Sequence, residues 1–208
     1  MATEFTLVRH GETVANLQGV IQGQTDVPLS AVGEEQARRL GARWRGRRFD
    51  AVYASDLART MRTAELALPG QPPIPTRELR EWDLGAWCGL TMDEISHRFP
   101  EEYAACRVGD ADCRLGGGES RRDLVERAGA FFLGAARRHP GERVAAFTHS
   151  GVIRALFTLT VGWEALSPAV GNTAICVLSY DPECGRWRLI SWNDTAHLDR
   201  PSGEIETL

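Results

Sequence analysis

The sequence predicts one α/β domain with a doubly wound, mainly parallel sheet and helices on both of its faces. A chain of 208 residues with 43% hydrophobic residues is long enough to bury one sizeable core. Three units of buried strand, polar loop and helix recur along the chain, and this alternation is typical of a parallel sheet. We therefore expect residues 1–208 to form a single domain.

The first unit begins with a short apolar strand over residues 5–8, followed by a polar loop that contains glycine. Residues 30–44 then place apolar and charged side chains at helical spacing, which predicts an amphipathic surface helix. Ser30 is the residue type that caps such a helix at its start.

The second and third units have the same order of strand, loop and helix. Residues 50–54 predict a strand, and Ser55 and Asp56 are expected to cap a helix over residues 57–67. The third strand is predicted over residues 143–148, with a helix beginning near Val152. Three further elements complete the prediction, namely a helix at 120–138 and strands at 174–180 and 187–192.

Residues 85–119 interrupt this pattern. A capping box from Thr91 to Glu94 predicts one short helix, and Pro100 and the glycines at 116–118 break the periodicity after it. We expect a lid-like insertion over the site, with a positioning role for its glycine run. The side chains available to line this lid and set specificity are Met92, Phe99, Tyr103, Arg107 and Arg114.

The charge composition excludes several functions. The formal net charge is -4, which disfavours nucleic acid or an anionic membrane as a partner. All 24 basic residues are Arg, so lysine-dependent chemistry such as a Schiff base or a P-loop is excluded. The dense basic run at 43–48 is interpreted as a solvated helix end.

The cysteine pattern and the N-terminus favour a cytoplasmic protein. Five scattered cysteines without CxxC spacing indicate neither a disulfide framework nor a zinc site, and we expect no metal and no cofactor. The first residues contain no basic segment followed by a long apolar stretch, so neither secretion nor a membrane span is expected.

Four cationic or imidazole side chains are predicted to meet at one edge of the sheet. Ligands of open α/β sheets bind outside the carboxyl ends of the strands, where the three loops lie. A phosphoryl group in transfer spreads negative charge over its oxygens and needs fixed cations and hydrogen-bond donors. The residues that match this requirement are Arg9, His10, Arg59 and His149.

Residues 7–13, with the sequence LVRHGET, resemble the signature of the histidine phosphatase (phosphoglycerate mutase-like) superfamily, and specifically its small bacterial-type phosphatases. Seven consecutive matching residues make this a specific signal. Further matches lie in order along nearly the whole chain, at Asn16, 22–30, 55–60, 79–85 and 148–151.

The resemblance implies a role for each matching residue. His10 resembles the nucleophile that becomes phosphorylated, and Arg9, Arg59 and His149 resemble the clamp around the phosphoryl group. Glu81 resembles the general acid, which protonates the leaving oxygen and then activates water. Further substrate contacts are expected from Asn16, Gln22, Gly23 and Ser150.

The function implied is a metal-independent phosphomonoesterase that hydrolyses a small phosphorylated metabolite through phosphohistidine. A cofactor-dependent phosphoglycerate mutase is the alternative within the family, disfavoured because the stretch from Glu81 to His149 is short. A phospholigand-binding protein without turnover is the alternative from another class. The choice stays open among phosphoserine-type, α-ribazole-phosphate-type, sugar-phosphate and broad-specificity phosphatases.

Two features near the C-terminus are left open by the sequence. The segment at 191–198 resembles a tail of small family members, and a structural strand end and a substrate-side role for Asn193 and His197 are equally compatible with it. Exposed edge strands in the same region are compatible with a homodimer.

Overall fold

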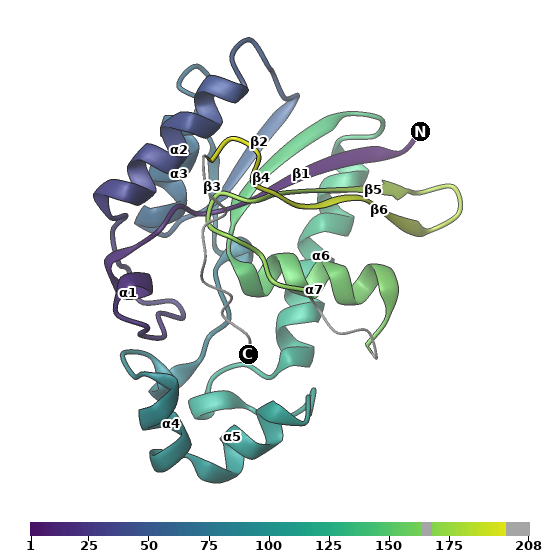
Figure 1. Ribbon diagram of the computed structural model, residues 1–208. Coiled ribbons are helices and arrows are strands. Elements are labelled where there is room, and N and C mark those ends of the chain that lie inside the picture. The colour runs from purple at the N-terminus through teal and green to yellow at the C-terminus, as the bar shows by residue number, and fades with distance from the viewer. Residues whose placement is uncertain (164–167, 199–208) are drawn as a thin grey trace.

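The computed structural model describes residues 1–163 and 168–198, and it is built on one six-stranded sheet (Figure 1). The strand order is β3-β2-β4-β1-β5-β6. The first four of these strands are mutually parallel, β5 is antiparallel to β1, and β6 is antiparallel to β5. The prediction of a mainly parallel sheet is confirmed. The strands are β1 (Thr3–Arg9), β2 (Ala51–Ser55), β3 (Ile74–Thr76), β4 (Arg143–Thr148), β5 (Ile175–Asp181) and β6 (Arg186–Asp194).

Helices cover both faces of the sheet (Figure 1). Because successive strand residues point to opposite faces, Phe5 and Leu7 of β1 pack with α6 and α7, whereas Val8 packs with α2 and α3. The sheet is therefore buried on both sides, as a doubly wound fold requires. The helices are α1 (Val14–Leu17), α2 (Ala31–Arg43), α3 (Ala58–Ala67), α4 (Met92–Arg98), α5 (Pro100–Arg107), α6 (Arg121–Arg138) and α7 (Ser150–Val161).

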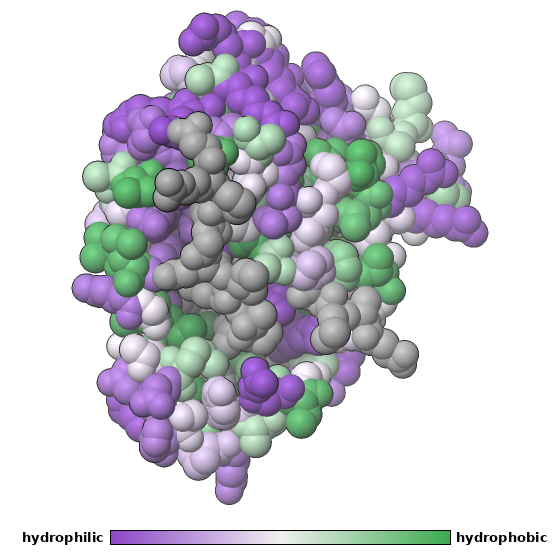
Figure 2. Space-filling model, viewed as in Figure 1, coloured by the Kyte–Doolittle hydropathy of each residue, from purple (hydrophilic) through white to green (hydrophobic). Residues whose placement is uncertain are grey.

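The outer side of α2 is hydrophilic, as its sequence predicted. Figure 2 shows hydrophilic residues gathered over this helix and over the loop that follows it, at the top of the view. Glu34 pairs with Arg38 on the same helix and with Arg62 of α3, which covers the helix pair with charge. The basic run at 43–48 continues this surface, and the guanidinium of Arg47 stacks over Trp44.

The starts of α2 and α3 confirm one predicted cap and correct another. The hydroxyl of Ser30 accepts the amide N–H of Gly33 at 3.0 Å, as expected for the start of α2. The cap predicted for α3 is wrong, because Leu57 occupies that position and makes no side-chain cap. The carboxylate of Asp26, from a distant loop, accepts the Ala58 N–H at 2.8 Å instead. A cap supplied by tertiary structure leaves no local sequence signal.

The segment at 85–119 forms a layer of its own beside the sheet, below it in Figure 1. Its α4 begins with the predicted capping box at Thr91. The second helix, α5, begins at Pro100, where the sequence predicts only a break in periodicity. Proline is tolerated at the first helical position. The two helices enclose a small separate core around Trp87, Ile95 and Leu115.

The described helices include none that is long and apolar enough to cross a membrane.

Candidate active site

His10 follows directly after β1 and is almost fully buried. Its Nδ1 lies 2.7 Å from the carbonyl oxygen of Gly11, and since a carbonyl only accepts, the ring proton is on Nδ1. The lone pair is then on Nε2. Burial first, and then the charges of Arg59 and Arg9, hold the pKa of His10 well below its usual value. The imidazole is therefore neutral at pH 7, which a nucleophile requires.

His149 follows β4, the strand next to β1, and its ring packs edge-on against His10 with centroids 5.1 Å apart. The Nε2 atom lies 2.9 Å from the hydroxyl of Ser55, which ends β2. Within the described part of the chain, Nδ1 is buried without a hydrogen-bond partner. Burial, followed by the charge of Arg59, lowers the pKa of His149 well below its usual value.

Arg59 lies in the first turn of α3 and is 1% exposed. Its terminal nitrogens donate to the carbonyl oxygens of Thr25 and Gly23, each at 2.7 Å. Burial lowers the pKa of Arg59 to about 10, so the guanidinium still carries its charge at pH 7. Gly23 adopts φ +50°, and a Cβ there would lie 2.5 Å from Cys88 Sγ, so only glycine fits this turn.

Arg9 is the last residue of β1 and is 3% exposed. One of its terminal nitrogens donates to the carbonyl oxygen of Val170 at 2.6 Å. The two buried guanidinium groups of Arg9 and Arg59 both act on the His10 imidazole electrostatically, which indicates that they lie around it. They supply the fixed positive charge that a phosphoryl group needs.

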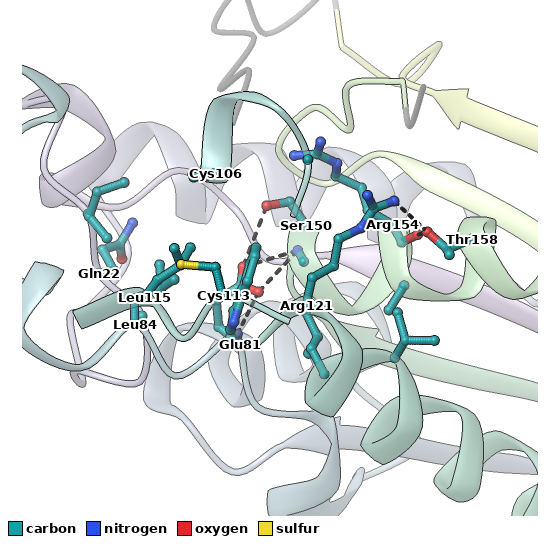
Figure 3. Close-up of a pocket in the computed structure, with 18 of the residues that line it drawn as sticks. Gln22, Glu81, Leu84, Cys106, Cys113, Leu115, Arg121, Ser150, Arg154 and Thr158 are labelled. Carbon is teal, nitrogen blue, oxygen red and sulfur yellow. Dashed lines mark hydrogen bonds between the residues drawn. The ribbon is translucent and has the colours of Figure 1, made fainter. Parts of the chain in front are cut away.

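Glu81 lies in the loop after β3, and its carboxylate sits at the start of α7. Oε1 accepts the backbone N–H of Gly151 at 3.0 Å and that of Trp82 at 2.9 Å. Ser150, the first residue of α7, places its hydroxyl 3.5 Å from Oε2. Figure 3 shows these contacts converging on the Glu81 carboxylate.

The loop that carries Glu81 is fastened to α6 by Arg127. The guanidinium donates to the carbonyl oxygens of Arg80 at 2.9 Å and Glu81 at 3.2 Å. It also forms an ion pair with Glu119 at 2.7 Å. The carboxylate of Glu119 in turn accepts the N–H of Asp83 at 3.0 Å. Glu119 follows the glycine run at 116–118, so that region positions the Glu81 loop in this structure.

The loop at 171–173 forms hydrogen bonds with the backbone of His10. The backbone N–H of Thr173 and the side-chain amide of Asn172 both donate to the carbonyl oxygen of His10, at 3.3 and 3.2 Å. The hydroxyl of Thr173 contacts Nε2 of His197 at 2.9 Å, and Oδ1 of Asn193 accepts the N–H of Gly171 at 2.7 Å. Asn193 and His197 thus hold the loop at 171–173, which contacts His10.

One cavity of about 650 Å³ collects most of the predicted site residues. Its wall contains Arg9, His10, Gln22, Gly23, Arg59, Glu81 and Ser150. Two predicted residues lie outside the wall. His149 is fully buried behind His10, and Asn16 is buried in α1, where its side chain accepts the N–H of Thr13 at 3.0 Å. Substrate contacts by these two residues stay predictions.

The lid residues that line the cavity differ from those predicted from the sequence. Arg107 lines the cavity, but Met92, Phe99 and Tyr103 pack against the separate core of the lid, and Arg114 forms an ion pair with Asp123. Trp82 also lines the cavity, whereas Trp87 is buried in the lid core. Several cavity residues were not predicted from the sequence, among them Arg121, Arg154 and Trp163.

The described residues contain no cluster of three or more His, Cys, Asp or Glu side chains arranged to hold a metal ion.

Comparison with known proteins decides the family. The histidine phosphatase superfamily (branch 1) matches this chain over residues 5–195. The chain belongs to the histidine phosphatase superfamily. It is 36% identical to the metal-independent phosphoserine phosphatase of Arabidopsis thaliana, with 94% of this chain and 83% of that protein covered. It is equally similar, at 36% identity, to phosphoglycerate mutase-like protein 4 of the same plant, with 94% and 87% covered.

Among solved structures, this histidine phosphatase is similar to a mycobacterial glucosyl-3-phosphoglycerate phosphatase. The two share 32% identity with a TM-score of 0.83, and 93% of this chain and 99% of that chain are covered. The family expected from residues 7–13 is confirmed, and so is its fold.

Proposed function

We propose that this histidine phosphatase hydrolyses small phosphomonoesters through a phosphohistidine formed on Nε2 of His10. The observation that carries the proposal is one cavity whose wall holds a neutral, tautomer-fixed imidazole, two buried guanidinium groups and a carboxyl group. Nucleophile, charge stabilisation and proton donor are the three parts that phosphoryl transfer requires. Phosphatases among the related proteins support the same function.

In the first half-reaction, the Nε2 lone pair of His10 attacks phosphorus while the bond to the leaving oxygen breaks. Arg9 and Arg59 stabilise the negative charge on the phosphoryl oxygens, because buried guanidinium groups act in a low local dielectric. The carboxylic acid of Glu81 gives its proton to the leaving oxygen, so an alcohol departs rather than an alkoxide. The products are phosphohistidine and the Glu81 carboxylate.

In the second half-reaction, the Glu81 carboxylate takes a proton from water, and the water oxygen attacks phosphorus. The P–N bond breaks, inorganic phosphate leaves, and His10 returns to its neutral form. Glu81 ends protonated, as it began, so one carboxyl group serves both steps. Its hydrogen bonds from Gly151 and Trp82 fix its position for both transfers.

The test is phosphate release from p-nitrophenyl phosphate and from phosphorylated metabolites, with a chelator present, by the wild type and by His10→Ala. We expect chelator-resistant release by the wild type and none by the variant. An acid-labile, alkali-stable phosphoryl label on His10 after rapid quenching identifies the intermediate directly. Release that survives in His10→Ala would falsify the proposed nucleophile.

The same assay separates the two alternatives. Conversion of 3-phosphoglycerate in the presence of a bisphosphate primer, without net phosphate release, would identify a mutase. Binding of phosphorylated ligands with neither activity would identify a binding protein. The presence of both His10 and Glu81 in the cavity wall supports turnover over binding alone.

The proposal also covers the partner of the enzyme, its location in the cell, the extent of its domain and its oligomeric state. Its partner is a small phosphorylated metabolite rather than nucleic acid, and it works in the cytoplasm, which the five free cysteines support. Residues 1–208 act as one domain, with 85–119 as the lid. Strand β6 lies at the edge of the sheet and is available for pairing in a homodimer.

A further inference from the structure

A second cavity, here called the rear cavity, lies at the opposite edge of the sheet from His10. It is formed by the ends of α2 and α3 and by the loops that follow them, and its volume is about 490 Å³. The loop after α2 enters the start of β2, whereas His10 and His149 follow the ends of the parallel strands β1 and β4. Figure 1 shows this loop at the top of the view and the lid helices α4 and α5 at the bottom. The two cavities share no lining residue.

The wall of the rear cavity is basic. Arg38 of α2 lines it, and so do Arg45, Arg47 and Arg48 of the loop, whereas none of its lining residues is Asp or Glu. Arg38 is neutralised by an ion pair with Glu34. Within residues 1–163 and 168–198, the three arginines of the loop form neither an ion pair nor a side-chain hydrogen bond.

The ends of the two helices balance only part of this charge. The last turn of a helix carries about half a negative charge, which a nearby cation complements. Ala42 near the end of α2 and Ala67 at the end of α3 both line the cavity, so the two helix ends together supply about one negative charge. The three guanidinium groups of the loop exceed it, which leaves about two positive charges in one cavity.

The basic loop is held against a firm apolar wall. The guanidinium of Arg47 stacks over the rings of Trp44 and Phe49, at 5.5 and 5.0 Å from their centres. The side-chain amide of Gln71, from the loop after α3, accepts the backbone N–H of Phe49 at 3.0 Å and donates to its carbonyl oxygen at 2.7 Å. These contacts fasten the two loops together. Apolar side chains of the same wall are those of Leu66, Leu68 and Pro69.

We propose that the rear cavity is a separate binding site for a small molecule with two or three linked phosphoryl groups. A guanidinium presents its N–H groups in a fork that matches two phosphate oxygens, and three such groups suit several linked phosphates better than one carboxylate. Each phosphoryl group also brings more negative charge than a carboxylate does. The volume of about 490 Å³ lies within the roughly 300–1,000 Å³ typical of small-molecule pockets. Inorganic polyphosphates and nucleoside polyphosphates share this chemistry.

The test is a ¹H–¹⁵N NMR titration of His10→Ala with inorganic phosphate, diphosphate and triphosphate at constant ionic strength, with ³¹P spectra to verify that the probes stay intact. The backbone amides of Gly46 and Gly70 report on the rear cavity, and those of Gly23 and Gly151 report on the catalytic cavity. We expect Gly46 and Gly70 to shift, and the Kd obtained from them to fall about tenfold for each added phosphoryl group, as charge-assisted hydrogen bonds accumulate. Shifts confined to Gly23 and Gly151 overturn the proposal.

Variants then assign the binding to the arginines of the loop. The double variant Arg45→Gln with Arg48→Gln should raise the Kd of triphosphate measured at Gly46 by about tenfold or more. Arg137→Gln with Arg138→Gln is the matched control, because these two exposed arginines end α6 and line neither cavity, yet their replacement removes the same charge. An unchanged Kd in the first double variant, or an equal rise in the second, contradicts the assignment.

Two further probes separate the sources of the ligand. Adenosine triphosphate that binds more tightly than inorganic triphosphate supports a nucleotide whose base contacts the apolar wall, and equal binding supports recognition of the phosphate chain alone. Single-stranded RNA that shifts Gly46 when triphosphate does not would make this surface a nucleic-acid contact, and would overturn the proposal. The site is independent of the proposed function, because Arg45→Gln with Arg48→Gln in the wild-type background should leave hydrolysis of p-nitrophenyl phosphate unchanged.

Discussion

Oε1 of Glu81 accepts the backbone N–H of Gly151 at 3.0 Å, and no side chain fits between them. A Cβ on residue 151 would lie 2.2 Å from Oε1, well inside van der Waals contact. Glycine is therefore required at position 151 to leave room for the Glu81 carboxylate, and not because of its own backbone conformation. This contact ties the start of α7 to the proposed general acid.

Gly151→Ala should accordingly displace the Glu81 carboxylate. We expect kcat for alkyl phosphates to fall about 10²- to 10⁴-fold, the usual contribution of a positioned acid, with a much smaller fall for p-nitrophenyl phosphate, whose leaving group needs no proton. Gly134→Ala on α6 is the control, since it only approaches the flexible Arg138 end. Equal losses on both substrates would argue against a positioning role.

The lowered pKa of His10 predicts how activity depends on pH. A free imidazole would lose its nucleophilic lone pair as pH falls through about 6.5. In this site the neutral form persists to lower pH, because burial and two arginines oppose protonation. We expect kcat/KM for p-nitrophenyl phosphate to show no acidic limb near pH 6.5, with any such limb displaced downward. An acidic limb of kcat/KM with its midpoint near pH 6.5 would contradict this.

The free energy of unfolding should decrease as pH falls below about 6.5, because the two buried histidines resist protonation in the folded state. His10 and His149 have folded-state pKa values below the unfolded value, so the unfolded chain binds more protons once pH drops below about 6.5. Their contribution is complete above that pH and is lost as pH falls toward the folded values. Each adds up to about 1.4 kcal/mol per pH unit to the slope. Urea unfolding between pH 7.5 and 5 measures it, and His149→Gln should flatten the curve.

Ser55 is expected to set the tautomer of His149. Its hydroxyl bonds Nε2 at 2.9 Å and also accepts the N–H of Leu57 at 3.4 Å, and within the described residues it is the hydrogen-bond partner that the His149 ring has, since Nδ1 has none. Ser55→Ala should lower kcat/KM about tenfold, the value of one hydrogen bond, and ¹⁵N NMR of the ring should show mixed tautomers. Thr60→Val is the control, because Thr60 bonds only the backbone of Ser55 and Leu57. An unchanged ring spectrum in Ser55→Ala would sink the idea.

The parts of the site that the sequence predicts are those fixed by local order along the chain. His10 and His149 each follow an apolar strand, and parallel strands bring their carboxyl ends to one edge whatever the loops between them do. Gln22 and Gly23 reach the cavity as well, which the resemblance to the family implied. The positions of these residues depend on strand topology and on continuous motifs, and both can be recognised in the amino-acid sequence.

The missed residues depend on side-chain direction and on distant loops. Arg121 and Arg122 are neighbours of the same type at the start of α6, and only the helical rotation of about 100° sends one into the cavity and the other to solvent. The cap of α3 comes from Asp26, about thirty residues away, where no local spacing rule applies. Such choices are made by packing, which leaves little trace in a single sequence.

Arg127 couples the stability of the fold to the position of the acid. Its side chain is 20% exposed, as is that of Glu119, and it also donates to three carbonyl oxygens of the loop that carries Glu81. Arg127→Gln leaves the Glu119 carboxylate half-buried without its cation and those carbonyls without their donors. We expect a loss of about 2–3 kcal/mol in the free energy of unfolding, measured in urea.

A double-mutant cycle separates the ion pair from the carbonyl contacts. Glu119→Gln alone should cost less, because the carbonyls keep their donor, and the coupling energy between the two positions should be about 1–2 kcal/mol. In both single variants, turnover of alkyl phosphates should fall more than that of p-nitrophenyl phosphate, since a loosened loop misplaces Glu81. Additive stabilities with no selective loss of alkyl turnover would show that the pair holds only the fold, and not the acid.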